Sequence, residues 1–394
     1  MSPNRLETQI LQALQSAIGP QEDFVLLHRP YLPPAAWDYV KECMDTGWVS
    51  SAGAFVTQFE EELAKFTGAN RAVAVVNGTA ALEVCLHLAG VSHDDEVWMP
   101  SLTFVATANA TMHLGARPHF IDVDPAYHGM CPQVLSERLS AIAETRDGGC
   151  FNRETGKRIA AVCPMHCFGL PCDLDALVNI CGNYEIPLVE DAAESLGSYY
   201  KSKHTGRHGK LAAVSFNGNK IMTTGGGGAI LTDDEELADH AKHLTTTAKK
   251  PDRWEFHHDA VAWNYRMPNI NAAMGVAQLE KLPEILSAKR KLHARYQEAF
   301  AAVAGVEMLT DPAWGQSNCW LNCILLDEDN FDLRESTLTL LNENQLQCRP
   351  LWQPMHTLPM FENCPRSGMT HTEAIYRRAI NIPSSADLAP GWQG

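Results

Sequence analysis

The 394-residue sequence has no apolar run long enough to cross a bilayer. Its first twenty residues also lack the uninterrupted apolar core of a signal peptide, because Arg5, Glu7 and several glutamines interrupt it. Basic residues are so few that the formal net charge is −16, and the repulsive field excludes general binding to nucleic acid or anionic membrane. We therefore expect a soluble cytoplasmic protein with no nucleic-acid or membrane partner.

The sequence also lacks an ordered set of metal ligands. Its twelve cysteines come without a secretion signal, which favours reduced thiols over a disulfide framework. The tightest group contains Cys163, His166, Cys167 and Cys172, and it lacks the paired spacings that a structural zinc site requires. We predict incidental or buried thiols and no metal.

A third absence concerns the loop that binds nucleoside triphosphates. The stretch "SFNGNKIMTTGGGGAILTDD", residues 215–234, places Lys220 ahead of four consecutive glycines. A Walker-type loop has glycine first and Ser or Thr directly after the lysine, so this order excludes that loop. Taken alone, Lys220 could equally be a solvated surface lysine.

What the sequence does contain is an alternation of short apolar runs and helical segments. Runs closed by polar or turn residues begin near positions 71, 95, 117, 158, 186, 211 and 227. Strands of this length, several of them separated by helices, predict an α/β fold with a mostly parallel, doubly wound sheet. Its binding crevice should lie at the carboxyl ends of the strands.

The pattern changes after about residue 260. Residues 269–305 form one long helical stretch, in which Pro283 predicts a break or kink. The runs "WLNCILLD" and "ESTLTLLNENQ" then indicate a smaller α+β C-terminal domain. We predict an N-terminal helical segment at 1–35, a large α/β domain at 36–275 and the smaller domain at 276–394.

Three predicted strand ends carry groups that could bind or react. Gly78 and Thr79 stand where a helix begins, which suits a phosphate, although Thr or Asn there can also be a plain helix cap. Asp191 ends an apolar strand and should face the crevice, unless it only caps the next helix. Ser215 and Lys220 lie at and just beyond a third strand end. A Schiff-base lysine, a carboxylate for a pyridinium nitrogen and a phosphate site are the parts that a pyridoxal phosphate enzyme requires.

The chain resembles the DegT family of sugar-nucleotide aminotransferases, within the fold-type-I pyridoxal phosphate enzymes. The resemblance rests on ordered motifs that cover most of the chain, namely "GWVSSAGAFVTQFEEELAKFTGA", "NGTAAL", "PSLTFVATANA", "EDAAESLGS", "SFNGNK", "GGGGAI", "NYRMPNINAAMGVAQLE" and "RPLWQPMH". The glycine stretch and the last motif are similar to the branch that aminates UDP-linked 4-keto-6-deoxy hexoses. The resemblance implies transfer of an amino group from glutamate to C4 of a UDP-linked 4-keto-6-deoxy-N-acetylhexosamine, for amino sugars of surface glycans.

The resemblance also implies roles around the ring of pyridoxal 5'-phosphate. Lys220 matches the lysine that holds the cofactor as a covalent internal aldimine and later moves protons, and Asp191 matches the partner of the pyridinium nitrogen. Phe104 matches an aromatic residue stacked on the cofactor. Glu194 stands near the ring hydroxyl at a position that is often Gln or His in the family, so its role departs from the pattern. His166 aligns near the ring, and a packed strand-end histidine is at least an equal alternative.

Other matches concern the phosphate and the substrate. Gly78, Thr79 and Ser215 match phosphate ligands, and Asn264 matches a phosphate contact donated by the other subunit of a homodimer. The glycines at 225–228 would let the backbone pass close to the cofactor without side-chain clash.

Two questions stay open at this point. Arg253, His257 and His258 could offset the acidic chain around a sugar diphosphate, or they could be ordinary solvated charges. The whole chain could instead catalyse another pyridoxal phosphate reaction, or be a catalytically silent binding or regulatory relative. Retention of Lys220 favours transamination over the sugar dehydration of relatives in which histidine replaces the lysine.

Overall fold

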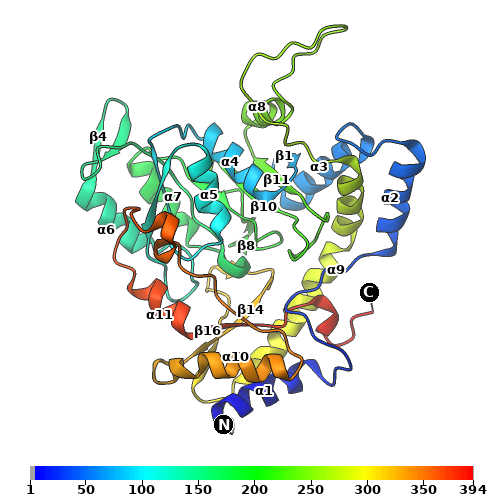
Figure 1. Cartoon of the computed structure of the whole chain (residues 1–394), viewed down its shortest axis with the longest axis vertical. Coiled ribbons are helices and arrows are strands. Elements are labelled where there is room, and N and C mark those ends of the chain that lie inside the picture. Colours follow the sequence, from blue (N-terminus) through cyan, green and yellow to red (C-terminus); the bar gives the residue numbers. More distant parts are fainter. Residues whose placement is uncertain (1–4, 394) are drawn as a thin grey trace.

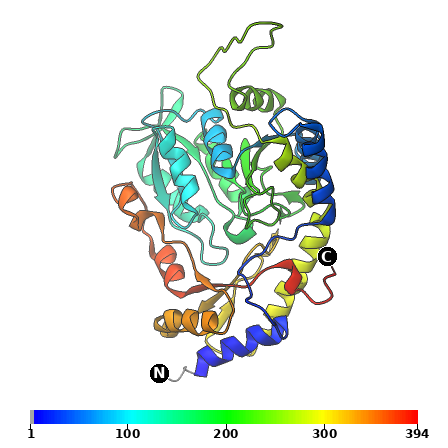
Figure 2. The same ribbon diagram turned by 45° about the vertical axis from the view of Figure 1, so that its right-hand side comes forward.

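A computed structural model describes residues 5–393 of the chain (Figure 1). Helix α9 (Asn269–Phe300) runs from a large α/β part into a smaller part (Figure 2). It continues through Pro283 without the expected break, because its packing against α1, α2 and α3 outweighs the single hydrogen bond that proline removes. The expected domain boundary at 275 falls inside this helix, so the division into domains stays a prediction. Neither α9 nor any other helix among residues 5–393 is long and apolar enough to span a membrane.

The main sheet consists of two groups of strands joined edge to edge. The first group has the order β1 (Arg71–Val75), β11 (Gly228–Thr232), β10 (Leu211–Ser215) and β7 (Val189–Asp191). The second has the order β6 (Ile159–Val162), β2 (Glu96–Pro100) and β3 (Arg117–Ile121). Parallel bridges from Val162 to Leu188 and from Met165 to Asp191 join β6 to β7. All neighbours run parallel except β11, which is antiparallel to β1 and β10, so the predicted mostly parallel α/β fold is confirmed.

Helices cover both faces of this sheet. They are α3 (Ala54–Thr67), α4 (Gly78–Leu88), α5 (Val105–His113), α6 (Pro132–Ile142), α7 (Leu174–Asn183) and α8 (Glu235–Thr245), while α2 (Pro34–Thr46) packs on α9. Successive side chains of a strand enter opposite cores, because they point to opposite faces. In β1, Val73 and Val75 pack with α4, α5 and α8, whereas Ala72 and Ala74 pack on the face that α3, α6 and α7 cover. Burial on both faces explains why these strands are apolar throughout.

The smaller part is built on an antiparallel sheet. Its order is β12 (Val306–Met308), β14 (Asn322–Leu326), β16 (Ala379–Ile382) and β15 (Arg349–Pro350). The N-terminal helix α1 (Arg5–Ile18) packs against α9 and α10 (Arg334–Glu343), so it lies beside C-terminal elements. The other elements are α11 (Thr370–Arg378), the short strands β4 (Ala143–Arg146), β5 (Gly149–Asn152), β8 (Tyr199–Tyr200), β9 (Lys203–His204) and β13 (Gly315–Gln316), and the 3-10 turns Cys167–Gly169, Glu328–Leu333, Met355–Thr357, Pro359–Phe361 and Ala386–Leu388.

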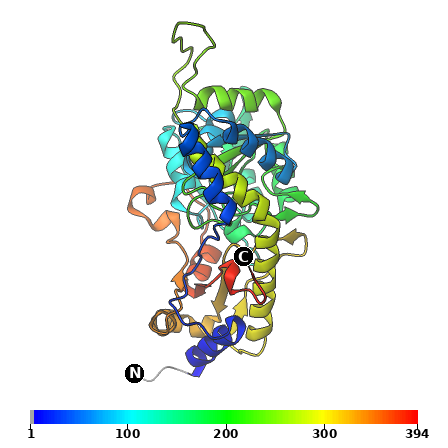
Figure 3. The same ribbon diagram turned by 90° about the vertical axis from the view of Figure 1, so that its right-hand side faces the viewer.

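Residues 247–263, between α8 and α9, form an arm that projects from the large part (Figure 3). Lys249 and His258 pair across the arm, and the backbone N–H of Lys250 donates to the carbonyl of His257 at 2.8 Å. Trp254 and Phe256 are 78% and 80% exposed, so the described part of the chain leaves the tip of the arm uncovered.

The last glycine of the glycine run touches the start of α4. A Cβ atom on Gly228 would lie 2.5 Å from the carbonyl carbon of Asn77 and 2.7 Å from the nitrogen of Gly78. A Cβ atom on Gly226 would meet no atom within 4 Å. The run therefore lets β11 pass against the turn before α4. This differs from the expected passage beside a cofactor, since residues 225–228 do not line the cavity described below.

Gly228→Ala is expected to lower the free energy of unfolding by about 1–3 kcal/mol, because the new methyl group must displace backbone atoms of Asn77 and Gly78. Gly226→Ala is the matched control, and it should be neutral or gain up to about 1 kcal/mol. Urea unfolding of the cofactor-free proteins measures both changes. Equal stability of the two variants would contradict the proposed backbone contact.

Candidate active site

A cavity of about 310 Å³ opens where the parallel strands of the main sheet end. Segments that follow β1, β2, β6, β7 and β10 reach it, and Trp320 and Trp352 line it from the smaller part. Among its lining residues are Gly78, Thr79, Phe104, Asp191, Glu194, Ser215 and Lys220. The structure thus brings these predicted residues together in the crevice expected for a doubly wound sheet.

Lys220 is a buried residue in the turn after β10. Its Nζ donates to Oε1 of Glu194 at 3.2 Å and lies 4.2 Å from the centre of the Trp320 ring. Trp320 also donates from Nε1 to the carbonyl oxygen of Asn219 at 2.7 Å, which fixes the backbone next to the lysine. Lys220 is only 8% exposed, so it is not the solvated surface lysine that the sequence left open.

Asp191, the last residue of β7, faces the cavity with neutral partners. Its Oδ2 accepts the hydroxyl of Thr107 at 2.6 Å, and its Oδ1 accepts the N–H of Ala193 at 3.1 Å. Burial raises the pKa of Asp191, although these donors act in the opposite direction. A residue that caps a helix must be followed by that helix, but turns follow Asp191. The alternative that Asp191 only caps a helix is therefore wrong. A cation in the cavity would compensate this buried carboxylate.

Glu194 holds a second buried carboxyl group beside Lys220. Its Oε2 accepts the backbone N–H of Phe168 at 3.0 Å, while Oε1 faces the lysine. Burial raises the pKa of Glu194 to about 7, even though Lys220 and the Phe168 N–H lower it. The group can therefore gain or lose a proton near neutral pH.

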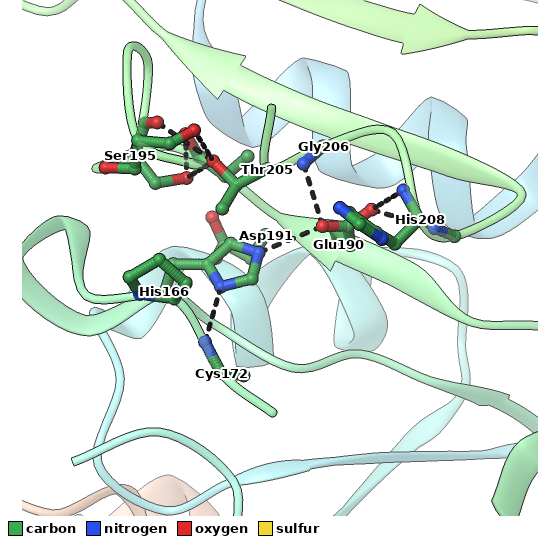
Figure 4. Close-up of polar contacts among 12 residues, drawn as sticks. His166, Cys172, Glu190, Asp191, Ser195, Thr205, Gly206 and His208 are labelled. Atoms are coloured by element: carbon green, nitrogen blue, oxygen red, sulfur yellow. Dashed lines mark hydrogen bonds and ion pairs between the residues drawn. The ribbon is translucent and has the colours of Figure 1, made fainter. Parts of the chain in front are cut away.

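Glu190 precedes the cavity-facing aspartate on β7 and points to the opposite side of the strand (Figure 4). It accepts backbone N–H groups of Gly206 at 2.7 Å, His208 at 2.6 Å and Gly209 at 2.7 Å, and it contacts Nε2 of His166 at 3.0 Å. Burial would raise the pKa of Glu190, but these donors outweigh burial and lower it to about 2. Glu190 is a permanent anion behind the site.

His166 belongs to this network (Figure 4). It is not one of the residues that line the cavity. Its Nδ1 accepts the backbone N–H of Cys172 at 3.2 Å, so Nε2 carries the proton that it donates to Glu190. It is therefore a packed strand-end histidine, the alternative that the sequence left open. Among residues 5–393 no group of His, Cys, Asp and Glu could hold a metal ion, and all twelve cysteines are buried free thiols.

The part of the cavity beside the start of α4 suits an anion. Asn77 caps α4 by accepting the N–H of Ala80 at 2.8 Å, so the cap is Asn77 and not Thr79. Gly78 and Thr79 form the first turn, whose N–H groups have no intrahelical acceptor, and both line the cavity. A Cβ atom on Gly78 would lie 2.8 Å from Cβ of Ser215, so glycine permits β10 to approach. Helix N–H groups and two hydroxyls thus converge here.

Asn264 does not reach this cavity. It is exposed at the base of the arm, where it pairs with Thr246. A role at a site on another subunit therefore stays a prediction.

Sequence reasoning predicted Phe104 but missed the two tryptophans of the cavity wall and the hydroxyl that holds Asp191. The ring of Phe168 lies 5.2 Å from Trp352 and 6.4 Å from Trp320, and Phe104 lies 6.4 Å from Trp352. Trp320 begins the run "WLNCILLD", which was interpreted as part of the smaller domain, and Trp352 lies in the family motif "RPLWQPMH". Each tryptophan could therefore have been noticed as a candidate for the site. Thr107 gave no signal, because its distance from Asp191 is set by the fold.

These residues fit pyridoxal phosphate. A buried amine can anchor the cofactor covalently, a carboxylate that lacks a cationic partner can bind a protonated ring nitrogen, and the start of α4 can bind the phosphate. The cavity volume lies at the lower end of the range of about 300–1,000 Å³ for ligand sites.

Comparison with known proteins decides the class. The model of the DegT/DnrJ/EryC1/StrS aminotransferase family matches residues 33–393. The chain belongs to this family. It is a pyridoxal phosphate-dependent aminotransferase that acts on nucleotide sugars, as the sequence predicted.

Three known proteins are similar to this aminotransferase over nearly its whole length. EpsN of Bacillus subtilis, named as a pyridoxal phosphate-dependent aminotransferase, is 35% identical over 94% of this chain and 93% of its own. GDP-perosamine synthase of Caulobacter vibrioides is 34% identical over 89% of this chain and 90% of its own. The crystal structure of the aminotransferase TlmJ from Streptoalloteichus hindustanus superposes with a TM-score of 0.83 at 28% identity, covering 92% of this chain and 93% of that one.

Glu190→Gln is expected to lower the free energy of unfolding at neutral pH by about 3 kcal/mol, because folding lowers the pKa of Glu190 from 4.5 to about 2. Folding favours the ionised form, so this contribution is complete above the unfolded pKa and is lost as the pH falls toward the folded one. Urea unfolding should show a constant difference above about pH 5 that shrinks below about pH 4.5.

The matched control is Glu307→Gln, which changes an exposed glutamate on β12 and should leave stability nearly unchanged. A difference for Glu190→Gln that stays the same at every pH would contradict a permanent anion at this position.

Proposed function

We propose that this aminotransferase transfers an amino group from glutamate to C4 of a UDP-linked 4-keto-6-deoxy-N-acetylhexosamine, in the synthesis of amino sugars for surface glycans. The observation that carries transamination is the buried amine of Lys220 inside the cavity. The motifs shared with the UDP-sugar branch support the nucleotide, and the cytoplasmic location stays a prediction.

The residues around the cavity have distinct tasks in this proposal. When bound, pyridoxal phosphate supplies an aldehyde and an electron-withdrawing ring. Lys220 binds that aldehyde and, once released, accepts and donates protons. Asp191 pairs with the ring nitrogen and keeps it protonated. Gly78, Thr79 and Ser215 bind the phosphate, because their N–H and hydroxyl groups line the same end of the cavity.

Aromatic residues define the remaining walls. Phe104 lies directly before α5 at the cavity, 48% exposed, and we assign it to stacking on the cofactor ring. Trp320 and Trp352 line the cavity from the smaller part, where their flat faces can pack on the apolar face of a sugar.

A GDP-linked keto sugar is a second candidate substrate. The supporting observation is the 34% identity to GDP-perosamine synthase over 89% of this chain. Both candidates require the same chemistry at the keto carbon, so the nucleotide is the point that separates them.

A substrate panel tests this function. The holoenzyme is incubated with glutamate and 4-keto or 3-keto sugars linked to UDP or GDP, and product mass is measured. We expect amination of the UDP-linked 4-keto sugar and ping-pong kinetics. Lys220→Ala should lose turnover by at least about 10³-fold, since the variant has no amine to bind or move protons. The matched control Lys65→Ala removes an exposed lysine of α3 and should retain activity. Absence of product from every keto sugar would overturn the assignment.

We also propose a homodimer in which the partner copy completes each site. Asn264 and the arm lie outside their own cavity, and the tip of the arm presents exposed Trp254 and Phe256. Burial of such aromatic residues against a second copy would remove a large apolar area from water. The basic residues Arg253 and His257 of the same arm would then approach the diphosphate of the partner's substrate.

Hybrid dimers test the shared site. Lys220→Ala and Asn264→Ala proteins are each expected to have low activity, whereas dimers made by denaturing and refolding an equal mixture should regain about a quarter of the wild-type value, because half the dimers are hybrid and each hybrid has one intact site. Refolded single variants are the controls. If Asn264 served its own chain, mixing would restore nothing.

A further inference from the structure

Lys220 and Glu194 form a pair in a buried pocket. Nζ of Lys220 lies 3.2 Å from Oε1 of Glu194, and both residues are less than a tenth exposed. The ring of Trp320 lies against the same ammonium group at 4.2 Å. The other oxygen of Glu194 accepts only the backbone N–H of Phe168, so Oε1 is free for the lysine.

We infer that Glu194 is the proton store of Lys220, so that the two groups share one proton over the working pH range. In one direction an N–H bond of the Lys220 ammonium breaks, its electron pair stays on Nζ, and an O–H bond forms at Oε1 of Glu194. In the other direction the same proton returns. The net charge of the pair is zero in both forms, and no other reactant is needed. The inference rests on the proposed role of Lys220.

The contrast with Glu190 explains why Glu194 can do this. Both carboxyl groups are buried on the segment that begins at β7. Glu190 has four donors, which hold it ionised. Glu194 has two, and one of them is the lysine itself. A buried carboxylate with few donors gains a proton readily, because desolvation disfavours its charge.

The surroundings contain few other charges that could fix the proton. The groups that act on Glu194 are Lys220 and Asp191, and Cys167 lies close enough to be affected by its charge. Lys220 also acts on His28, whose own pKa is lowered by burial. Burial raises the pKa of Glu194 to about 7, near the pH at which the enzyme would work.

A stored proton suits the chemistry assigned to Lys220. The released lysine must be neutral to accept a proton and charged to return one, yet an ordinary lysine with a pKa of about 10.4 is almost fully charged at neutral pH. Exchange with an adjacent carboxyl group can take up a proton from the lysine and return it without water entering the cavity. A glutamine at this position could not accept the proton.

The test compares wild type with Glu194→Gln, both freed of cofactor. Pyridoxal phosphate is added at a series of pH values, and the growth of visible absorption gives the rate of covalent attachment, which needs a neutral Lys220. The wild-type rate should rise to about pH 7 and then level off. Above that pH the ionised carboxylate of Glu194 keeps the one shared proton on the pair, so the share of neutral Lys220 stops increasing. The Glu194→Gln rate should go on rising, so that at about pH 9 the variant exceeds wild type by tenfold or more. The rate of Glu194→Gln is divided by the wild-type rate at each pH, because the titration of free cofactor affects both rates equally and cancels.

A second measurement does not involve the cofactor. Infrared spectra of the cofactor-free proteins should contain the carbonyl band of a protonated buried carboxyl group, which disappears in wild type near pH 7 and is absent from Glu194→Gln. Glu307→Gln is the matched control, because it makes the same change at an exposed glutamate on β12 and should keep both the levelling and the band. A wild-type rate that never levels, or a wild-type band that does not titrate near pH 7, would overturn the proton store. Covalent attachment in Lys220→Ala would instead overturn the proposed role of Lys220.

Discussion

The ionised carboxylate of Glu190 is the contact on which the geometry of the site depends. It joins the end of β7 to the loop at 206–209 through three backbone N–H groups, and to the segment after β6 through His166. If the charge were lost, one carboxyl oxygen would carry a proton and the group could no longer accept all of those donors, which is costly in a buried region. Because Asp191 is the next residue, the position of the cavity-facing carboxylate follows directly from this network. The buried charge of Glu190 on one side of β7 therefore fixes the carboxylate of Asp191 on the side that faces the cavity.

Much of the large part could be predicted from the sequence, because its signals are local. Apolar runs identify the strands, and Gly78, Asp191 and Lys220 lie within a few residues of strand ends, where a parallel sheet gathers its ligands. The antiparallel direction of β11 had no such signal, since strand direction depends on the path of the chain. The course of α9 through Pro283 was also hidden, because tertiary packing decides whether a proline interrupts a helix.

Residues contributed by distant segments were the hardest to predict. Thr107 reaches Asp191 across 84 positions, and Trp320 reaches Lys220 from the smaller part. Neither pairing leaves a pattern in one sequence, because each depends on how two elements pack. The sequence did identify Glu194 as a departure from the family pattern, and the structure gives that departure a physical meaning, since a carboxyl group there contacts the amine directly.

The continuity of α9 has a mechanical consequence for the enzyme. A helix of 32 residues is about 48 Å long, and bending it sharply would break several backbone hydrogen bonds. It packs against α2 and α3 in the large part and against α1 in the smaller part, so both of its ends are held by neighbouring helices. The two parts therefore cannot swing open about this helix as a hinge. Movement of loops and side chains around the cavity is then the less costly way to admit a bulky nucleotide sugar.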